Sequence, residues 1–504
     1  MEQRGWLVAH GGEWNDLLAV SAFERSRGLF ATGDISEGAL LLSVPAAVLL
    51  TARIADEWQW PASLQEADKI ALVLMIEVEK LETSKWHPWT ASIPKEFNLP
   101  FTWEASSGGD GGGSRSSSAR VEITELRSPE LTARVTAQQA DAKERFEAIR
   151  ALTHGLDPQH QLRLLFERSR GDDDSVWRRY LWALSALESR GKYLEDEALH
   201  AERWAVVPAG DGFNHASAED ANVDAAFDRG RRAFVYRTAR AVSRGEELLL
   251  CYGPHDDSTL VQSYGFVLPD NPHARVLLPP RRVEGDHEQV ETRKAHEESC
   301  DQLEARPTVG SSAGAAHGGG TAGWLSAADM AWLEENGLSE AEHALHPFGP
   351  SWSLLGALRL LHASPTERGG GAAFAIVEGE PVSSRCECLV WSHARQMAEE
   401  LLRGRFADLE SLEDELEAAR KPRPRGSVPD GGSASKRERR LLTLQWLVSQ
   451  GNVVKAALEA IAAQQAELNA EEEEEDQRRH EGAEGDEDVQ HAEFESRQQK
   501  KQRV

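Results

Sequence analysis

Cysteine is scarce in this chain. Its 504 residues include only 4 cysteines, which are Cys251, Cys300, Cys386 and Cys388. So few cysteines exclude a disulfide framework and indicate a reducing compartment. Cys386 and Cys388 have a close spacing that could begin a zinc site, but tetrahedral zinc needs four ligands, and His393 alone does not complete the set. We therefore expect no metal site.

The chain also lacks a long apolar run. No stretch of about 18 consecutive apolar residues occurs, so we expect no membrane-spanning helix and no membrane partner. The first residues, MEQRGWLVAHGGEW, lack the apolar core of a signal peptide and the Arg- and Ser-rich, acid-poor composition of a transit peptide. We expect a cytoplasmic or nuclear location, with a plastid as the alternative.

Basic residues are outnumbered by acidic ones. The chain has 56 Lys and Arg against 84 Asp and Glu, which gives a formal net charge of −28. Because nucleic acids are themselves strongly negative, this charge argues against a nucleic-acid partner and favours a basic protein. Hydrophobic residues make up 40% of the chain, enough for the cores of two or three domains. We expect a monomer.

Hydrophobic patterning predicts the elements of the first half of the chain. Gly28–Thr32 and Ala39–Val44 have the composition of strands and are separated by turn residues. Ala67–Leu81 repeats apolar residues at helical spacing over a wide arc, which predicts a well-buried helix. Leu126–Leu152 and Val176–Ser189 are predicted to be further helices.

Composition marks three segments that lack a packed core. Residues 106–118 are rich in Gly and Ser and predict a disordered loop, and residues 281–323 predict a flexible linker. Residues 471–504 begin with five glutamates and predict a disordered tail. The pattern of residues 324–470 is helical. The predicted helices there are Trp352–His362, Ser392–Arg403, Leu409–Arg420 and Arg437 to about Glu471.

Reactive side chains gather in residues 207–266. The sequence DGFNH places Asp211, Asn214 and His215 close together. Alone, such a cluster more often forms a local turn with a buried, hydrogen-bonded histidine. A serine hydrolase is disfavoured because no Gly-x-Ser-x-Gly motif is present. Metal ligation by Asp211 and His215 is disfavoured because the nearby glycines argue against the helix that would align them.

A hairpin is predicted inside the same segment. Ala233–Val242 and Glu247–Tyr252 are strand-like, and Ser243–Glu246 contains the glycine that a tight turn favours. Beyond it, tyrosine directly precedes glycine at Tyr252 and again at Tyr264, although the whole chain has only 5 tyrosines. This concentration of a scarce residue favours a functional role for the segment.

Five motifs follow one another in a characteristic order: RGLFATGDI, LESRGKYL, DGFNH, CYG and SYGF. Their order and spacing resemble the SET-domain protein methyltransferases, and most closely the subgroup of Rubisco large-subunit methyltransferase. The resemblance covers Arg25 to about Leu278 and continues more weakly into the helical C-terminal part. It implies an α+β fold with a SET-type β core of short sheets, knot-like threading and a helical insert, followed by an all-α C-terminal domain.

The same resemblance divides the chain into parts. Residues 1–50 and 201–280 would form the two parts of the SET core, and residues 51–200 would form the helical insert. Residues 324–470 look like the substrate-binding domain of the subgroup. The threading would make this fold an exception to the usual avoidance of knots.

The resemblance also implies an activity and a set of site residues. The activity is that of a protein-lysine N-methyltransferase that uses S-adenosyl-L-methionine and acts on a non-histone protein. Tyr252 is implied as the catalytic residue beside the methyl-transfer site, and Tyr264 and Phe266 as residues that bind the substrate lysine. The implied cofactor-binding residues are Arg27, Gly28, Arg190, Asp211, Asn214, His215 and Tyr252.

Two departures from the subgroup leave the substrate open. Lys192 stands where the subgroup usually has an aromatic residue, and residues 216–228 lack a tyrosine that some members have. A SET-like enzyme that methylates histidine or another nucleophile is therefore one alternative. A catalytically inert SET-fold scaffold is another. The sequence leaves open the substrate, the acceptor residue and the number of methyl groups added.

Overall fold

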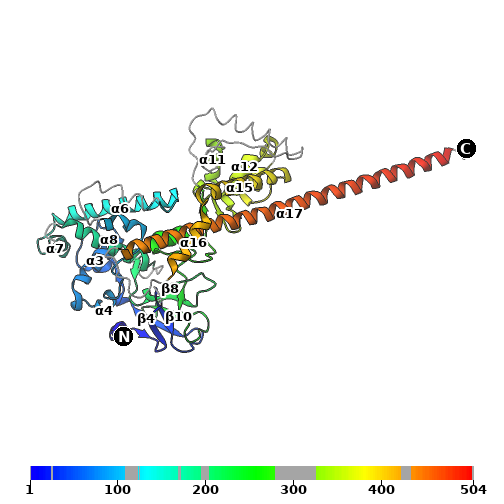
Figure 1. Cartoon of the computed structure of the whole chain (residues 1–504). Coiled ribbons are helices and arrows are strands. Elements are labelled where there is room, and N and C mark those ends of the chain that lie inside the picture. The colour runs from blue at the N-terminus through cyan, green and yellow to red at the C-terminus, as the bar shows by residue number, and fades with distance from the viewer. Residues whose placement is uncertain are drawn as a thin grey trace. The chain divides into compact units, whose positions relative to one another are not determined.

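A computed structural model of the chain (Figure 1) describes residues 2–23, 26–107, 123, 125–168, 172–193, 204–278, 325–369, 371–421 and 433–501. Most of the predicted loop at 106–118 and all of the predicted linker at 281–323 lie outside these residues. The chain forms two structural units. The first comprises residues 1–273 and 413–447, and the second comprises residues 274–412 and 448–504.

A six-stranded sheet organises the first unit. Its strand order is β1-β4-β10-β9-β11-β8, so strands from both ends of the unit pair with one another. In its centre Val44 of β4 lies opposite Phe234 of β10. At its edge β11 runs parallel to β8 and β9. The bounds are β1 (Glu13–Trp14), β4 (Leu40–Pro45), β8 (Asn214–His215), β9 (Val223–Asp228), β10 (Ala233–Thr238) and β11 (Leu249–Leu250).

The predicted hairpin between residues 233–242 and 247–252 is wrong. The turn exists, because Glu246 N–H donates to the Ser243 carbonyl at 3.1 Å, with Gly245 at φ +90°. After the turn, however, the chain pairs with an N-terminal strand: Leu248 N–H donates to the Leu29 carbonyl at 2.7 Å. The antiparallel partners of β10 are instead β9 and β4, which both precede it in the chain.

Two smaller sheets complete the β core of this unit. In the first, β2 and β3 are antiparallel, and Gly28 lies opposite Ser21. In the second, the strand order is β5-β7-β6, and Lys192 lies opposite Ala205. These short sheets agree with the predicted SET-type core, while the implied threading stays a prediction. The bounds are β2 (Leu18–Phe23), β3 (Ser26–Ala31), β5 (Leu50–Thr51), β6 (Gly191–Tyr193) and β7 (Trp204–Val206).

The helical insert contains three long helices, all close to the predicted ranges. These are α3 (Glu66–Glu79), α6 (Pro129–Thr153) and α8 (Asp173–Arg190). Helix α3 packs against α8, and the buried Tyr180 hydroxyl donates to Asp68 Oδ1 at 2.6 Å. The shorter helices of the unit are α1 (Glu2–Ala9), α2 (Arg53–Glu57), α4 (His87–Thr90), α7 (Gln161–Glu167) and α9 (Asp257–Thr259).

The second unit is mainly helical, as predicted, with a small antiparallel sheet of order β12-β13-β14. A buried ion pair joins two of its helices: Arg359 Nε donates to Glu387 Oε1 at 2.9 Å. The strands are β12 (Val276–Leu277), β13 (Ala344–His346) and β14 (Gly349–Pro350). The helices are α11 (Ala327–Glu335), α12 (Trp352–His362), α13 (Pro365–Gly369), α14 (Ala372–Glu378) and α15 (Ser384–Arg405). Helix α16 (Leu409–Arg420) begins in this unit, and its residues from Glu413 onward belong to the first unit.

The last helix is longer than predicted. Helix α17 spans Ser433–Lys501, so the structure continues the helix through most of the tail that was predicted to be disordered from Glu471. The reason is composition: the tail is rich in Glu, Gln and Arg, which favour helix, and it contains no proline. No helix within the described part of the chain is long and apolar enough to cross a bilayer.

Candidate active site

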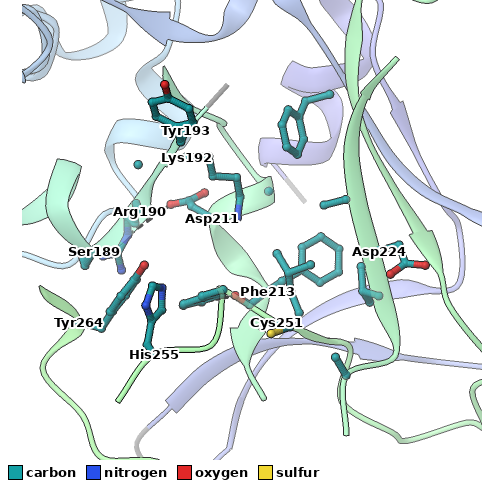
Figure 2. A pocket seen from close by; sticks show the side chains of 18 of the residues that line it. Ser189, Arg190, Lys192, Tyr193, Asp211, Phe213, Asp224, Cys251, His255 and Tyr264 are labelled. Carbon is teal, nitrogen blue, oxygen red and sulfur yellow. Dashed lines mark hydrogen bonds and ion pairs between the residues drawn. The ribbon is translucent and has the colours of Figure 1, made fainter. Parts of the chain in front are cut away.

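A cavity of about 600 Å³ opens in the first unit beside the edge of the main sheet (Figure 2). Its walls come from the end of α8, from β6, from the loop before β8 and from the segment after β11. We call it the Tyr252 cavity. The side chains that line it include Arg190, Lys192, Asp211, Phe213, Tyr252 and Tyr264.

Asn214 ties strand β8 to the N-terminal hairpin. Its Nδ2 donates to the Arg27 carbonyl at 3.2 Å and to Glu247 Oε1 at 2.7 Å. A Cβ atom added at Gly28 would lie 2.2 Å from Glu247 Oε1 and 2.9 Å from Asn214 Nδ2. Only glycine therefore leaves room for this hydrogen bond. We call Arg27, Gly28, Asn214 and Glu247 the Asn214 cluster.

His215 connects the Asn214 cluster to the Tyr252 cavity. Its Nδ1 accepts a hydrogen bond from Tyr252 N–H at 3.1 Å, which leaves the ring proton on Nε2. Burial lowers the pKa of His215, and nearby His255 and His273 add to this, against the opposing effect of a hydrogen bond to the Leu250 backbone. The ring is therefore neutral at pH 7. It lies 5.0 Å from the Tyr252 ring and 5.9 Å from the Phe266 ring.

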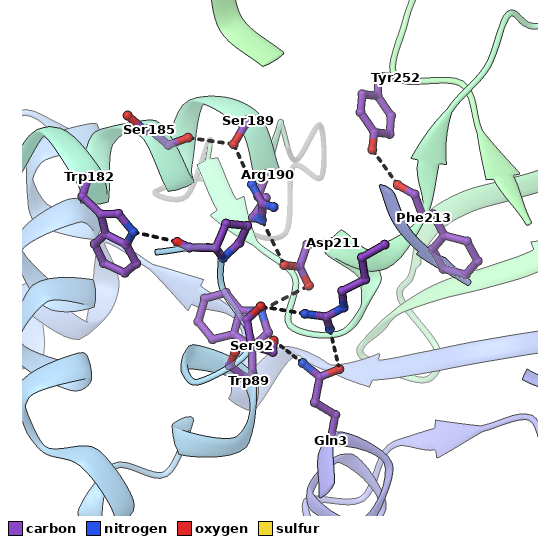
Figure 3. A network of polar contacts seen from close by, with 12 residues as sticks. Gln3, Trp89, Ser92, Trp182, Ser185, Ser189, Arg190, Asp211, Phe213 and Tyr252 are labelled. Atoms are coloured by element: carbon purple, nitrogen blue, oxygen red, sulfur yellow. Dashed lines mark hydrogen bonds and ion pairs between the residues drawn. The ribbon is translucent and has the colours of Figure 1, made fainter. Parts of the chain in front are cut away.

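Asp211 holds Arg190 in place rather than pointing freely into the cavity (Figure 3). One carboxylate oxygen lies 3.4 Å from Arg190 Nε, and the other accepts from Trp89 Nε1 at 3.1 Å. Arg190 Nη1 donates to Ser189 Oγ at 2.8 Å, and its guanidinium lies 4.9 Å from the centre of the Phe97 ring. Arg190 is therefore fixed on three sides.

The side chain of Arg27 turns away from the cavity. Its Nη1 donates to the Ser92 carbonyl at 2.6 Å, and its Nη2 lies 3.5 Å from Gln3 Oε1. Only the Arg27 backbone reaches Asn214. A cofactor contact at this residue would therefore come from the backbone, while the side chain anchors the hairpin to helix α1 and to the turn after α4.

Tyr252 and Tyr264 form an aromatic wall. The Tyr252 hydroxyl donates to the Phe213 carbonyl at 2.5 Å, and its ring lies 5.2 Å from that of Tyr264. Burial raises the pKa of Tyr252 well above its ordinary value, against the opposing effect of Arg190. Tyr252 is thus a neutral hydrogen-bond donor. The Tyr264 ring lies 6.1 Å from the ring of Phe266, so both predicted substrate residues belong to one aromatic group.

Sequence reasoning missed Glu247 and Tyr236. Tyr236 is fully buried, and its ring stacks on Phe213 at 4.8 Å. Its hydroxyl has no hydrogen-bond partner among the described residues. The scarcity of tyrosine could have found it: of the 5 tyrosines, three line the Tyr252 cavity and Tyr236 packs directly behind it. Glu247 carries no comparable signal in the sequence.

The two cysteines of the predicted but rejected zinc motif are not paired in space. Cys386 is buried on α15, and Cys388, two positions along the same helix, is only half-buried. Residues two apart on a helix do not face each other. The described residues contain no group of three side chains that could hold a metal ion.

Residues 26–253 match the family model of the SET domain. This chain carries a SET domain. The match begins at the Ser26–Gly28 strand entry and ends at Tyr252-Gly253. It therefore includes every predicted cofactor-binding residue, and it confirms the resemblance drawn from the motifs.

Known SET-domain proteins are similar over about half of this chain. SET domain-containing protein 4 of Mus musculus is 30% identical over 294 residues, which are 55% of this chain and 60% of the mouse protein. An actin-histidine N-methyltransferase of Canis lupus familiaris is 22% identical over 280 residues, covering 54% of this chain and 43% of that protein. The chain thus spans about three-fifths of the mouse protein and less than half of the canine one.

A solved structure is similar over most of the chain. It is the SET domain of Rubisco large-subunit methyltransferase bound to lysine and S-adenosylhomocysteine, with a TM-score of 0.57 and 16% identity. The similarity covers 93% of this chain and 92% of the solved one. At this identity it shows the fold, and it confirms the predicted fold class of a SET core followed by a helical region.

Proposed function

We propose that this SET-domain chain is a protein methyltransferase that uses S-adenosyl-L-methionine and takes lysine as its acceptor. One observation carries the proposal: strand β8 joins a polar cluster to an aromatic cavity. Asn214 binds the Arg27 carbonyl on one side, and the next residue, His215, accepts from the Tyr252 backbone on the other. A cofactor and an acceptor need such adjacent but different surroundings.

The residues present fit this cofactor. The half-buried guanidinium of Arg190 has one nitrogen, Nη2, without a hydrogen-bond partner in the described structure, and it suits a carboxylate. The backbone at Gly28 and the polar edges of Asn214 and His215 supply further hydrogen bonds. When bound, S-adenosyl-L-methionine supplies an electrophilic methyl group. We assign Arg190, Gly28, Asn214 and His215 to holding it.

The chain itself has to orient the acceptor and exclude water. Tyr252, Tyr264 and Phe213 give the cavity apolar walls, and such surroundings favour the neutral form of an amine. The bond from the Tyr252 hydroxyl to the Phe213 carbonyl fixes the ring beside the acceptor position. Alignment of reacting groups and removal of water account for most of the catalysis that we assign to these side chains.

A lysine acceptor is favoured by an amine that the cavity already holds. The Lys192 side chain points into it, and burial lowers the pKa of Lys192 to about 8. The walls therefore accept an alkylamine and shift it toward its neutral form. The similar solved structures contain lysine or methyllysine, which agrees with this assignment. Histidine is the second candidate, because some relatives are actin-histidine N-methyltransferases.

The test is mass spectrometry of lysates incubated with the chain and S-adenosyl-L-methionine that carries a deuterated methyl group. We expect labelled lysine in one or a few proteins, and no label with the Asn214→Ala variant. Label on histidine would favour the second candidate. A chain whose melting temperature rises with the cofactor, but which labels nothing across diverse lysates, would instead be a binding scaffold.

A further inference from the structure

Lys192 has an unusual position for a lysine. It lies in the middle of β6, directly after the end of α8, and the strand is fixed by its pairing with Ala205 of β7. A Cβ atom added at the preceding Gly191 would lie 2.6 Å from the Leu187 carbonyl, so the backbone here is tightly packed. Figure 2 shows the side chain extending into the Tyr252 cavity beside Asp211.

The amine of Lys192 reaches the aromatic wall without an ion-pair partner. Its Nζ lies 5.5 Å from the centre of the Tyr252 ring. In the described structure no carboxylate lies within ion-pair distance of it, and both oxygens of nearby Asp211 already serve Arg190 and Trp89. With burial lowering the pKa of Lys192 to about 8, roughly a tenth of the amine is neutral at pH 7.

These are the properties that the proposed reaction requires of an acceptor: an amine, at the aromatic wall, with a ready neutral form. We propose that Lys192 is an internal methyl acceptor, so that the chain methylates its own Lys192 when no other substrate fills the cavity. The inference rests on the proposed function, which supplies the methyl donor, and adds a specific substrate to it.

The electron pair of the neutral Nζ forms the new nitrogen–carbon bond, and the methyl–sulfur bond of the methylsulfonium donor breaks. The sulfur keeps the bonding pair and becomes a neutral thioether. The positive charge passes to the methylated amine, which returns its proton to water when it next becomes neutral.

The experiment uses the purified full-length chain and the deuterated-methyl cofactor without any other protein. Cleavage after glutamate releases Ser189–Glu195, which contains Lys192 as its only lysine. We expect one labelled methyl group on this peptide, acquired with the same first-order rate at two protein concentrations tenfold apart. A rate that rises with protein concentration would mean transfer between molecules and would overturn the internal reaction.

Lys85 is a matched internal control. It also lies over an aromatic ring, with Nζ 4.0 Å from the centre of the Trp86 ring, and burial lowers its pKa too, but it lies outside the cavity. We expect no label on Lys85. The Lys192→Arg variant should lose the label on the 189–195 peptide completely, while cofactor still raises its melting temperature.

The outcomes separate the inference from the proposed function. A chain that labels lysate proteins but never its own Lys192 overturns the inference and leaves the proposed function standing. Equal labelling of Lys85 and Lys192 also overturns it, because a position in the cavity would then not favour methylation. A folded chain that neither responds to the cofactor in melting nor transfers label to any protein overturns both.

Discussion

The Asn214 cluster and the Tyr252 cavity are neighbours, but they differ in whether their polar groups have hydrogen-bond or ion-pair partners. In the cluster, the side chain of Asn214 is hydrogen-bonded to the Arg27 carbonyl and to Glu247. In and behind the cavity, the Lys192 amine has no ion-pair partner and the Tyr236 hydroxyl no hydrogen-bond partner among the described residues. Satisfied groups stabilise the fold, whereas unsatisfied buried groups cost stability and are kept where a reaction uses them.

The largest expected effect tests the cavity. Tyr252→Phe keeps the ring but removes the hydroxyl that donates to the Phe213 carbonyl. We expect the methylation rate to fall about a hundred- to thousand-fold, which is the usual effect of losing one well-placed donor. Single-turnover rates with bound cofactor measure this. Tyr180→Phe, which removes a buried hydroxyl in the helical insert, is the control and should lower stability alone. Equal rates for Tyr252→Phe and the parent would contradict the assignment.

The next effect tests the cluster. Asn214→Ala leaves Glu247 Oε1 without its amide donor, so we expect a loss of about 1–3 kcal/mol in the free energy of unfolding. Cofactor affinity should fall at the same time, which calorimetric titration measures. The matched control is Asn222→Ala, because buried Asn222 donates to the Glu247 backbone and accepts from Leu249 N–H. It should lose stability but keep cofactor affinity; a matching affinity loss would argue against a special role for Asn214.

An effect of similar size, but of opposite sign and dependent on pH, tests the burial of Lys192. Burial lowers its pKa from 10.5 to about 8, so folding disfavours the protonated amine. Below pH 8 the buried amine lowers the free energy of unfolding by its full amount, and this loss disappears as pH rises toward 10.5. Lys192→Met should therefore raise the free energy of unfolding by about 1–3 kcal/mol at pH 7, and the gain should shrink by pH 10. The titratable and charged groups that line the cavity with it are Arg190, Tyr193, Asp211, Asp224, Cys251, Tyr252, His255 and Tyr264.

Denaturant unfolding of the parent and of Lys192→Met at pH 7 and pH 10 measures this prediction. Because the surrounding groups are the same in both proteins, their own titration largely cancels in the difference. A difference between the two proteins that stays constant over this pH range would contradict the burial of the amine.

The smallest expected effect is that of Tyr236→Phe. Its hydroxyl has no partner in the described structure, so removing it should change the free energy of unfolding by less than about 0.5 kcal/mol, or raise it. Thermal melting measures the change. A marked loss of stability would mean that the hydroxyl is hydrogen-bonded in solution. The contrast between cluster and cavity would then rest on Lys192 alone.

Local patterns predicted the helices well and the strand pairing poorly. The observed α12 and α16 have the predicted bounds, Trp352–His362 and Leu409–Arg420, because helical periodicity depends only on residues a few positions apart. The pairing of β11 depends on β8 and β9, which lie far back in the chain, and the hairpin rule failed there. Local sequence patterns therefore cannot predict which distant strands pair.

Only those residues of the candidate site that belong to a recognisable motif were named from the sequence. Arg190, Asp211 and Tyr252 line the Tyr252 cavity, and Asn214 and His215 lie beside it on β8, while their roles in binding a cofactor stay predictions. Glu247 was missed because its role arises only when residues 33 positions apart meet at Gly28. The direction of the Arg27 side chain, toward Ser92 and Gln3, could not be predicted, because an exposed arginine in a strand gives no sign of its direction; the backbone contact with a cofactor stays a prediction.

The pairing of β4 with β10 has a consequence for synthesis on the ribosome. The two strands are about 190 positions apart, so β4 emerges long before its central partner exists. At about 5–20 residues per second, the wait is roughly ten to forty seconds. During this time Leu41, Leu42 and Val44, all fully buried in the finished sheet, have the short strand β1 beside them but lack β10. We therefore expect this apolar strand to stay exposed until the helical insert and β10 have been made.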